Sequence, residues 1–168
     1  METALEHILT STYKVGMISY LKAHPEDFEE AIKLAISDKQ PYAWRAAWLL
    51  WSCMEENDTR IRKYIKEIVN SVKQKKDGHQ RELIKILLQM ELNEKYEGLL
   101  FNICLDVWEQ INKNPSVRFT AMKFIIMMSK KHPDLAKEIT FLTQDQYLET
   151  LSPGVKRSIS KMMKGLIP

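Results

Sequence analysis

The chain has 168 residues, of which 45% are apolar and 28% are charged, proportions close to the average for globular proteins. This composition excludes a disordered, a collagen-like and a membrane-embedded chain, and the length predicts one domain over residues 1–168. The net charge of +3 comes from 25 basic against 22 acidic residues, so the bulk charge does not indicate a nucleic-acid binder.

The sequence carries no targeting or metal-binding pattern. The first residues, METALEHILTSTYKVGM, include Glu2 and Glu6 and lack a long apolar stretch, so we expect no signal peptide. The longest apolar run, AAWLLW at 46–51, is far shorter than the roughly 20 residues that cross a bilayer. Cys53 and Cys104 have neither a C-x-x-C spacing nor a nearby partner histidine, so we expect no metal, no cofactor and no disulfide. These features predict a cytoplasmic protein with two buried thiols.

Helix signals follow one another along the whole chain. The internal prolines stand where helices would begin, because a proline in the first turn gives up no hydrogen bond; they are Pro25, Pro41, Pro115, Pro133 and Pro153. Apolar residues at helical spacing follow each proline, and similar stripes lie between these segments. Helices are therefore predicted to begin near residues 4, 25, 41, 59, 78, 93, 115, 134 and 153. About nine helices and no strand predict an all-α protein.

The predicted helices recur at a regular interval. Two helices return about every 37 residues, and the segment 41–65 aligns with 115–139, which places Ala47 opposite Ala121 among coinciding apolar positions. Because one helix pair cannot bury its own apolar face, the pairs are predicted to stack as an α-solenoid of about four pairs. A short up-and-down helical bundle also has regularly spaced helices and is the alternative.

A recurring motif marks the second helix of each pair. In the stretch NKNPSVRFTAMKFI, which begins at Asn112, a proline precedes Val-Arg and then Ala, and DKQPYAWRAAWLLW at 38–51 has one extra residue before Arg45. The segments 77–88 and 152–163 keep fewer of these residues. The pattern resembles the start of the second helix in HEAT repeats, and the resemblance extends over nearly the whole chain. It implies a HEAT-like, armadillo-type α-α superhelix.

The resemblance also implies roles for charged residues. Loop acids and helix arginines of neighbouring HEAT units tend to form a ladder, which here would contain Arg45, Arg81, Arg118, Arg157, Asp38 and Asp77, with Asn114 as a neutral substitute. If the second helices line the concave side, that side carries a basic binding surface made of Trp44, Arg45, Arg81, Lys85, Arg118, Arg157 and Lys161. Such a surface suits an acidic peptide or a phosphate backbone. An ordinary solvated helix face would give the same pattern of charges.

Three tryptophans lie on one predicted helix. Trp44, Trp48 and Trp51 are spaced i, i+4 and i+7, which forms an aromatic ridge. One interpretation is a stacking platform, as in sites that combine aromatic and cationic side chains. The interpretation that we adopt is core packing, because the residues between the tryptophans leave almost no polar face. Trp44, beside Arg45, is the member expected to reach the surface.

No catalytic motif is present. The sequence contains no G-x-S-x-G, P-loop or G-x-G-x-x-G pattern, and its histidines are scattered. We therefore predict a non-catalytic scaffold or binding module that docks a protein or peptide on its concave helix surface. The alternative is a nucleic-acid binder or a DNA-repair protein, because bacterial alkylation-repair glycosylases are similar in fold class.

Overall fold

Prolines and capping side chains set the helix starts in the computed structural model, which describes residues 1–166. Pro115 and Pro153 each occupy the first turn of a helix, where a missing N–H leaves no acceptor unpaired. Asn114 and Ser152 precede them, and their side chains accept hydrogen bonds from the backbone N–H groups of Ser116 and Val155. Asn114 and Ser152 therefore mark the end of their loops, and each accepts a hydrogen bond from a backbone N–H group that has no partner inside the helix.

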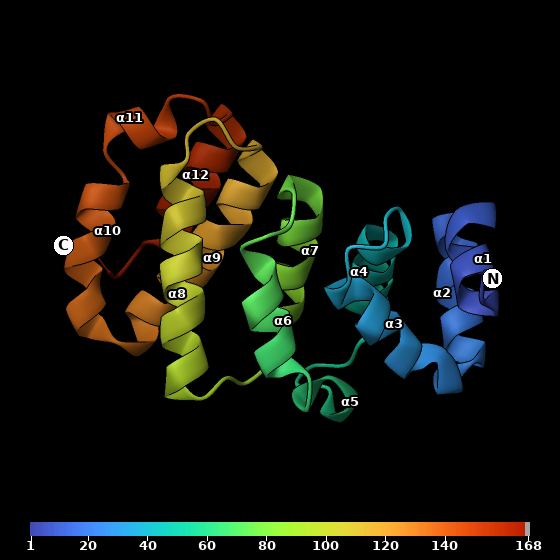
Figure 1. Cartoon of the computed structure of the whole chain (residues 1–168). Helices are drawn as coiled ribbons and strands as arrows, with labels where there is room; N and C mark the ends of the chain where they lie inside the picture. The colour runs from blue at the N-terminus through green and yellow to red at the C-terminus, as the bar shows by residue number, and fades with distance from the viewer. Residues whose placement is uncertain (167–168) are drawn as a thin grey trace. The chain divides into compact units, whose positions relative to one another are not determined.

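The chain divides into two compact units, Met1–Leu92 and Asn93–Pro168, shown from blue to green and from yellow to red in Figure 1. The first unit contains α1 (Ala4–Ser11), α2 (Lys14–Ala23), η1 (Pro25–Asp27), α3 (Phe28–Ile36), α4 (Tyr42–Cys53), α5 (Thr59–Arg62), α6 (Ile65–Val72) and α7 (Asp77–Leu88). The second contains α8 (Glu94–Glu109), α9 (Pro115–Lys131), η2 (Pro133–Leu135), α10 (Ala136–Leu142), α11 (Asp145–Leu148) and α12 (Pro153–Met162). One domain over residues 1–168 stays a prediction.

The all-α class and the repeating helix starts are confirmed. Among residues 1–166 there are helices and no strand, and α4, α7, α9 and α12 begin within a residue or so of the predicted starts. The count of nine is too low, since α2, α6 and α11 bring the α-helices of the described residues to twelve. The break between α1 and α2 falls at Thr12 and Tyr13, which are extended. No proline marks this break, and the two helices that it separates both pack on α4.

Helix α4 is the centre of the first unit. It packs against α1, α2, α3 and α7, and its buried face carries Ala43, Ala46, Ala47, Leu49 and Leu50, all without exposed surface. Small residues let neighbouring helix backbones come close on both sides, because there is little side chain to keep them apart. The three tryptophans of α4 therefore lie outside its most tightly packed face.

The second unit is built on α9. This helix packs against α8, α10 and α12, and its buried residues include Val117, Ala121, Phe124 and Ile125. Trp108 of α8 is fully buried, and its Nε1 donates a hydrogen bond to the carbonyl oxygen of Leu142 at 2.7 Å. This bond satisfies the one polar atom of a large core side chain, as buried indoles require.

A polar network holds the loop between α3 and α4. His79 of α7 is buried, with Nε2 2.7 Å from the carbonyl oxygen of Ala35 and Nδ1 3.0 Å from Gln40 Nε2. In the neutral tautomer Nε2–H donates and Nδ1 accepts. Lys75 is also buried, and its Nζ donates to the Ser37 carbonyl and to Asp38 Oδ1. Each side chain therefore gives a hydrogen-bond donor to a backbone carbonyl, His79 at the end of α3 and Lys75 in the loop that follows.

Enlarging either buried alanine of the repeat should destabilise the protein. Ala47 and Ala121 have no exposed surface, so Ala47→Leu or Ala121→Leu should lower the free energy of unfolding by about 1–3 kcal/mol through overpacking. Urea denaturation measures this loss. Ala23→Leu, at an exposed site on α2, is the control and should stay close to the parent; similar losses in all three variants would contradict this packing.

The buried imidazole should make stability depend on pH. Burial lowers the pKa of His79 below its ordinary 6.5, with the Lys75 charge acting in the same direction and the hydrogen bond to Ala35 opposing it. As the pH falls, His79 therefore takes up a proton at a higher pH in the unfolded chain than in the folded protein. The contribution of neutral His79 to the free energy of unfolding is complete above pH 6.5 and is lost as the pH falls towards the folded pKa.

The loss should reach up to about 1.4 kcal/mol per pH unit over that window. Thermal unfolding at about pH 7 and pH 5 measures it. The variant His79→Gln keeps a hydrogen-bond donor and an acceptor but cannot take up a proton. Its stability should therefore differ less between the two pH values than that of the parent. If the variant loses as much stability at low pH as the parent, groups other than His79 cause the pH dependence.

Candidate functional site

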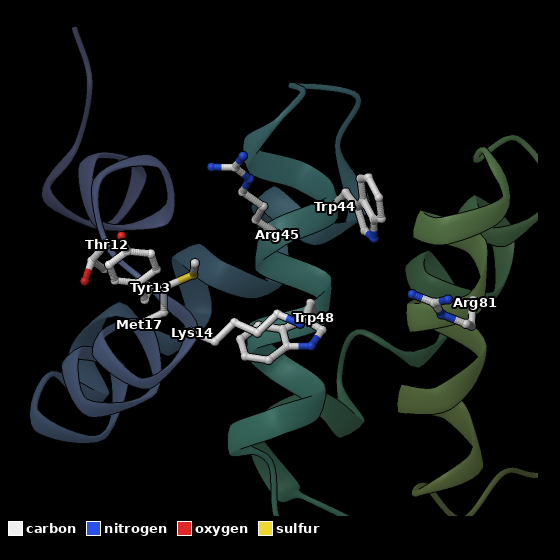
Figure 2. Close-up of a pocket in the computed structure, with 8 residues that line it drawn as sticks. All are labelled: Thr12, Tyr13, Lys14, Met17, Trp44, Arg45, Trp48 and Arg81. Carbon is white, nitrogen blue, oxygen red and sulfur yellow. The ribbon is translucent and has the colours of Figure 1, made fainter. Parts of the chain in front are cut away.

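A pocket of about 480 Å³ opens in the first unit. It lies between the α1–α2 junction, α4 and α7, and Figure 2 shows the eight side chains that line it. These are Thr12, Tyr13, Lys14, Met17, Trp44, Arg45, Trp48 and Arg81. The lining thus combines aromatic and cationic side chains and contains no carboxylate.

The aromatic walls are exposed to solvent. Tyr13 is 90% exposed and Trp44 47% exposed, and Trp48 is half-buried. The indole of Trp44 rests on the first turn of α7, where a Cβ added to Gly78 would lie 2.6 Å from its Cζ2 atom. The glycine therefore leaves the room that this indole position requires. Exposed rings of this size offer a large apolar contact area to a ligand.

The cations at the pocket are held in place by neighbouring groups. The Nζ atom of Lys14 lies 5.0 Å from the centroid of the Trp48 ring, within the range of a cation–π contact, and Figure 2 shows the two side chains alongside each other. Arg45 donates from a guanidinium nitrogen to the carbonyl oxygen of Leu9 at 2.9 Å. Arg81 points from α7 towards α4 (Figure 2), with a guanidinium nitrogen 3.0 Å from Glu82 Oε1.

A buried acid beside the pocket is shared by two cations. The Glu82 side chain is 1% exposed, and its other oxygen lies 3.3 Å from the Nζ atom of Lys85. That Nζ atom also lies 3.6 Å from the centroid of the Trp51 ring. One carboxylate therefore faces two positive charges on α7, so the surface between α4 and α7 keeps a positive excess.

Part of the predicted basic surface is assembled in the first unit. Trp44, Arg45 and Arg81 line the pocket, and Lys85 lies one helical turn beyond Arg81. Arg157 and Lys161 are exposed on α12 of the second unit. Whether these two belong to the same surface stays a prediction.

The assignment of Arg118 to an exposed surface is wrong. Its side chain is fully buried, with Nε 2.9 Å from the Trp108 carbonyl oxygen and its terminal nitrogens 2.7 Å from the Tyr147 carbonyl and 3.1 Å from Thr150 Oγ1. The guanidinium also stacks on the Trp108 ring at 4.4 Å. Burial lowers the pKa of Arg118. Arg118 is thus a core residue that ties α9 to α8 and to the segment around α11.

Several residues of the predicted acid–arginine ladder contact other partners than the ones expected. Asp38 accepts from Lys75 Nζ at 2.7 Å, so a lysine takes the place expected for an arginine. Arg45 and Arg118 donate to backbone carbonyls. Asn114 caps α9 by accepting from the backbone N–H of Ser116 at 2.9 Å. The pairing of Asp77 in a ladder stays a prediction.

Two predictions about buried side chains need correction. Of the tryptophans on α4, Trp44 reaches the surface as expected, but Trp48 and Trp51 are half-buried instead of packed in the core. The α4 alanines occupy the close helix contacts, which displaces the indoles to the sides. Cys104 is buried whereas Cys53 is half-buried, and burial raises the pKa of both thiols.

Four lining residues come from a segment that the sequence did not single out. Thr12, Tyr13, Lys14 and Met17 lie at the break between α1 and α2. The only sequence signal was Gly16, four residues after a β-branched threonine, whose Oγ1 would lie 2.3 Å from an added Cβ. That close approach depends on the turn, so the glycine alone could not identify a pocket.

Neither a metal centre nor a membrane span is found in the part of the chain that the structure describes. Within residues 1–166, no three His, Cys, Asp or Glu side chains are grouped so as to hold a metal ion. None of the helices in this range has the length and apolarity needed to cross a bilayer.

Comparison with known families identifies the repeat. The family model of the HEAT repeat domain matches residues 1–166, which confirms the resemblance drawn from the proline and Val-Arg motif. Comparisons with curated proteins and with solved structures give no match. The match therefore concerns the repeat architecture of residues 1–166 and names no partner.

Removing the buried guanidinium should destabilise the protein. Arg118→Ala deletes the donors to two carbonyls and one hydroxyl in a buried site, and should lower the free energy of unfolding by about 2–4 kcal/mol. Arg157→Ala, at an exposed arginine on α12, is the matched control and should change it by less than about 0.5 kcal/mol. Equal effects in urea denaturation would refute the core role of Arg118.

Proposed function

The chain belongs to the HEAT repeat family, and from this premise we propose that it is a non-catalytic binding module. In this proposal, the pocket of the first unit docks an acidic segment of a partner protein that also carries an apolar anchor. Helical-repeat proteins bind partners along surfaces to which successive repeats each contribute similar contacts. The pocket fits this pattern because α4 and α7 each supply a basic residue to it.

One observation carries the proposal: exposed aromatic rings and cations meet in a pocket whose lining has no carboxylate. Lys14, Arg45 and Arg81 come from three different helices. A carboxylate entering the pocket would meet only positive charge in its lining, and an arginine can bind it through two parallel hydrogen bonds. The rings of Tyr13 and Trp44 would cover the apolar part of the same segment.

The two kinds of contact should contribute unequally. Exposed ion pairs are worth about 0–1 kcal/mol each, whereas a desolvated aromatic anchor at an interface is worth about 2 kcal/mol or more. Trp44 should therefore determine most of the affinity. The cations should instead govern the rate of association and the choice of acidic over basic partners.

The composition of the lining supports binding without catalysis. General acid–base chemistry uses a carboxylate, a histidine or a similar group next to the reacting atoms. The eight lining residues include neither a histidine nor a carboxylate, and their cations are held by Leu9, Glu82 and the Trp48 ring. A cytoplasmic location, inferred from the unpaired thiols of Cys53 and Cys104, belongs to the same proposal.

A nucleic acid is the second candidate ligand. Single-stranded nucleic acids bind where cations follow the backbone and bases stack on aromatic side chains, and Trp44 beside Arg45 offers both. Affinity for a phosphate backbone falls steeply with salt, because each contact releases counterions. A peptide anchored on Trp44 should lose much less affinity over the same range of salt.

A direct binding test distinguishes these ligands. The probes are the fluorescein-labelled peptide Gly-Glu-Asp-Phe-Glu-Asp-Gly, its counterpart with lysines for the acids, and a labelled oligothymidylate, followed by fluorescence anisotropy. We expect the acidic peptide to bind best. Trp44→Ala should weaken its binding about 30-fold, the equivalent of about 2 kcal/mol, and Arg45→Glu should weaken it less.

Two controls separate the pocket from general charge and from unfolding. Lys66→Glu changes an exposed residue of α6 by the same charge as Arg45→Glu and should leave binding unchanged. All variants are melted beside the parent, because Arg45→Glu also removes the hydrogen bond to the Leu9 carbonyl. Equal binding of the acidic and basic peptides, or full binding by Trp44→Ala, would reject the pocket as the docking site. Tighter binding of oligothymidylate with a steep salt dependence would favour the nucleic acid.

A further inference from the structure

A second pocket, of about 430 Å³, lies within the second unit. The first half of α8, the end of α9 and the η2 segment form its walls. The lining residues are Glu94, Glu97, Gly98, Phe101, Asn102, Met128, His132 and Leu135. Its chemistry is opposite to that of the first pocket, because two of the side chains that line it are carboxylates.

Gly98 keeps this pocket open. It lies inside α8, where a glycine makes a helix less stable than an alanine would. No packing requirement explains the glycine, because an added Cβ would have no atom within 4 Å. A larger side chain at this position would extend into the space that the pocket now occupies.

Glu97 places a carboxylate with an unused hydrogen-bonding capacity at the pocket. The residue is 6% exposed, and Lys131 Nζ donates to its Oε2 atom at 2.6 Å. Its Oε1 atom is buried and has no hydrogen-bond partner, since His132 Nε2 stays 3.6 Å away. A buried carboxylate oxygen without a donor is costly and uncommon in folded proteins.

The rest of the pocket combines apolar walls with one more acid. Phe101, Met128 and Leu135 supply the apolar surface, and Glu94 is exposed one helical turn before Gly98. A group that fits must therefore carry hydrogen-bond donors and positive charge on an apolar stem. Long cationic side chains have this form, since their methylene stems cover apolar surface while the charged end stays polar.

We propose that the pocket of the second unit binds a primary ammonium group carried on an apolar stem. The stem lies against Phe101 and Met128, and the ammonium donates to Glu97 Oε1 and to Glu94. To reach Oε1 the ammonium takes the place now held by the half-exposed His132 ring. The proposal is independent of the first pocket, because all lining residues belong to the second unit.

Other ligand classes fit less well. An anion would face two carboxylates, and an uncharged apolar molecule would leave Glu97 Oε1 without a donor at a cost in free energy. An ammonium offers three donors, so it can satisfy Oε1 and still bond to a second acceptor. A lysine of a partner protein and a small free amine share this chemistry.

The test observes the methyl group of Met128 by NMR in protein labelled with ¹³C-methyl methionine. Met128→Leu assigns its signal among those of the nine methionines. Benzylamine is the probe for a free amine and benzyl alcohol its uncharged control. A blocked Gly-Lys-Gly peptide is the probe for a protein side chain, with the acetylated-lysine peptide as its control. We expect benzylamine to shift the Met128 signal saturably and benzyl alcohol to leave it in place.

The peptide arm identifies the source of the amine. A shift with Gly-Lys-Gly that disappears with acetyl-lysine indicates a lysine of a partner protein, whereas a shift with benzylamine alone indicates a small amine. Both results support the ammonium site. Equal shifts with benzylamine and benzyl alcohol, or no shift with either amine, would overturn it.

Variants at the open glycine supply the structural control. Gly98→Leu should fill the pocket and abolish the shift, whereas Gly98→Ala adds one methyl group and should preserve it; both should fold, since Cβ meets open space. Glu94→Gln should weaken binding several-fold, and Glu97→Gln should abolish it. Because Glu97 also pairs with Lys131, its variant is melted beside the parent. If Gly98→Leu binds benzylamine as well as Gly98→Ala does, the site lies elsewhere.

Discussion

The close packing of α4 is the constraint on which the first unit depends. Ala43, Ala46 and Ala47 allow neighbouring helices to approach α4 closely, and this leaves no space for indoles on the same face. Trp44, Trp48 and Trp51 are consequently placed where solvent and cations reach them. The two tryptophans that line the pocket, Trp44 and Trp48, are therefore placed by the way α4 packs.

Buried cations complete the packing in both units. Lys75 in the first donates to the Ser37 carbonyl and to Asp38, and Arg118 in the second donates to the carbonyls of Trp108 and Tyr147. Asp38 also neutralises the charge of Lys75, whereas Arg118 donates to two carbonyls and a hydroxyl through charge-assisted hydrogen bonds. This arrangement replaces part of the acid–arginine ladder that the HEAT resemblance implied. It also explains why a basic residue at a repeating position need not be available to a ligand.

The two pockets differ in what they would select. The first presents cations and aromatic rings without a carboxylate, and the second presents two carboxylates with apolar walls. Opposite charge gives each pocket a means of rejecting the ligand of the other, because an unpaired charge that loses its water is costly. If both proposals hold, one chain distinguishes an acidic ligand from an ammonium group by the charge of each pocket.

The sequence by itself determined the helical class, the positions of most helices and the repeat. Prolines at helix starts and apolar stripes act locally, so they can be read without coordinates, and Ala47 and Ala121 were placed in the core from the same stripes. The HEAT resemblance placed Trp44, Arg45 and Arg81 on one surface, and all three line the pocket of the first unit. Only the tertiary structure showed that Arg118 is buried, since its carbonyl and hydroxyl partners lie at Trp108, Tyr147 and Thr150, distant in the chain. It also decided the turn at Tyr13 and the open oxygen of Glu97, because both depend on which helices pack together and not on local preference.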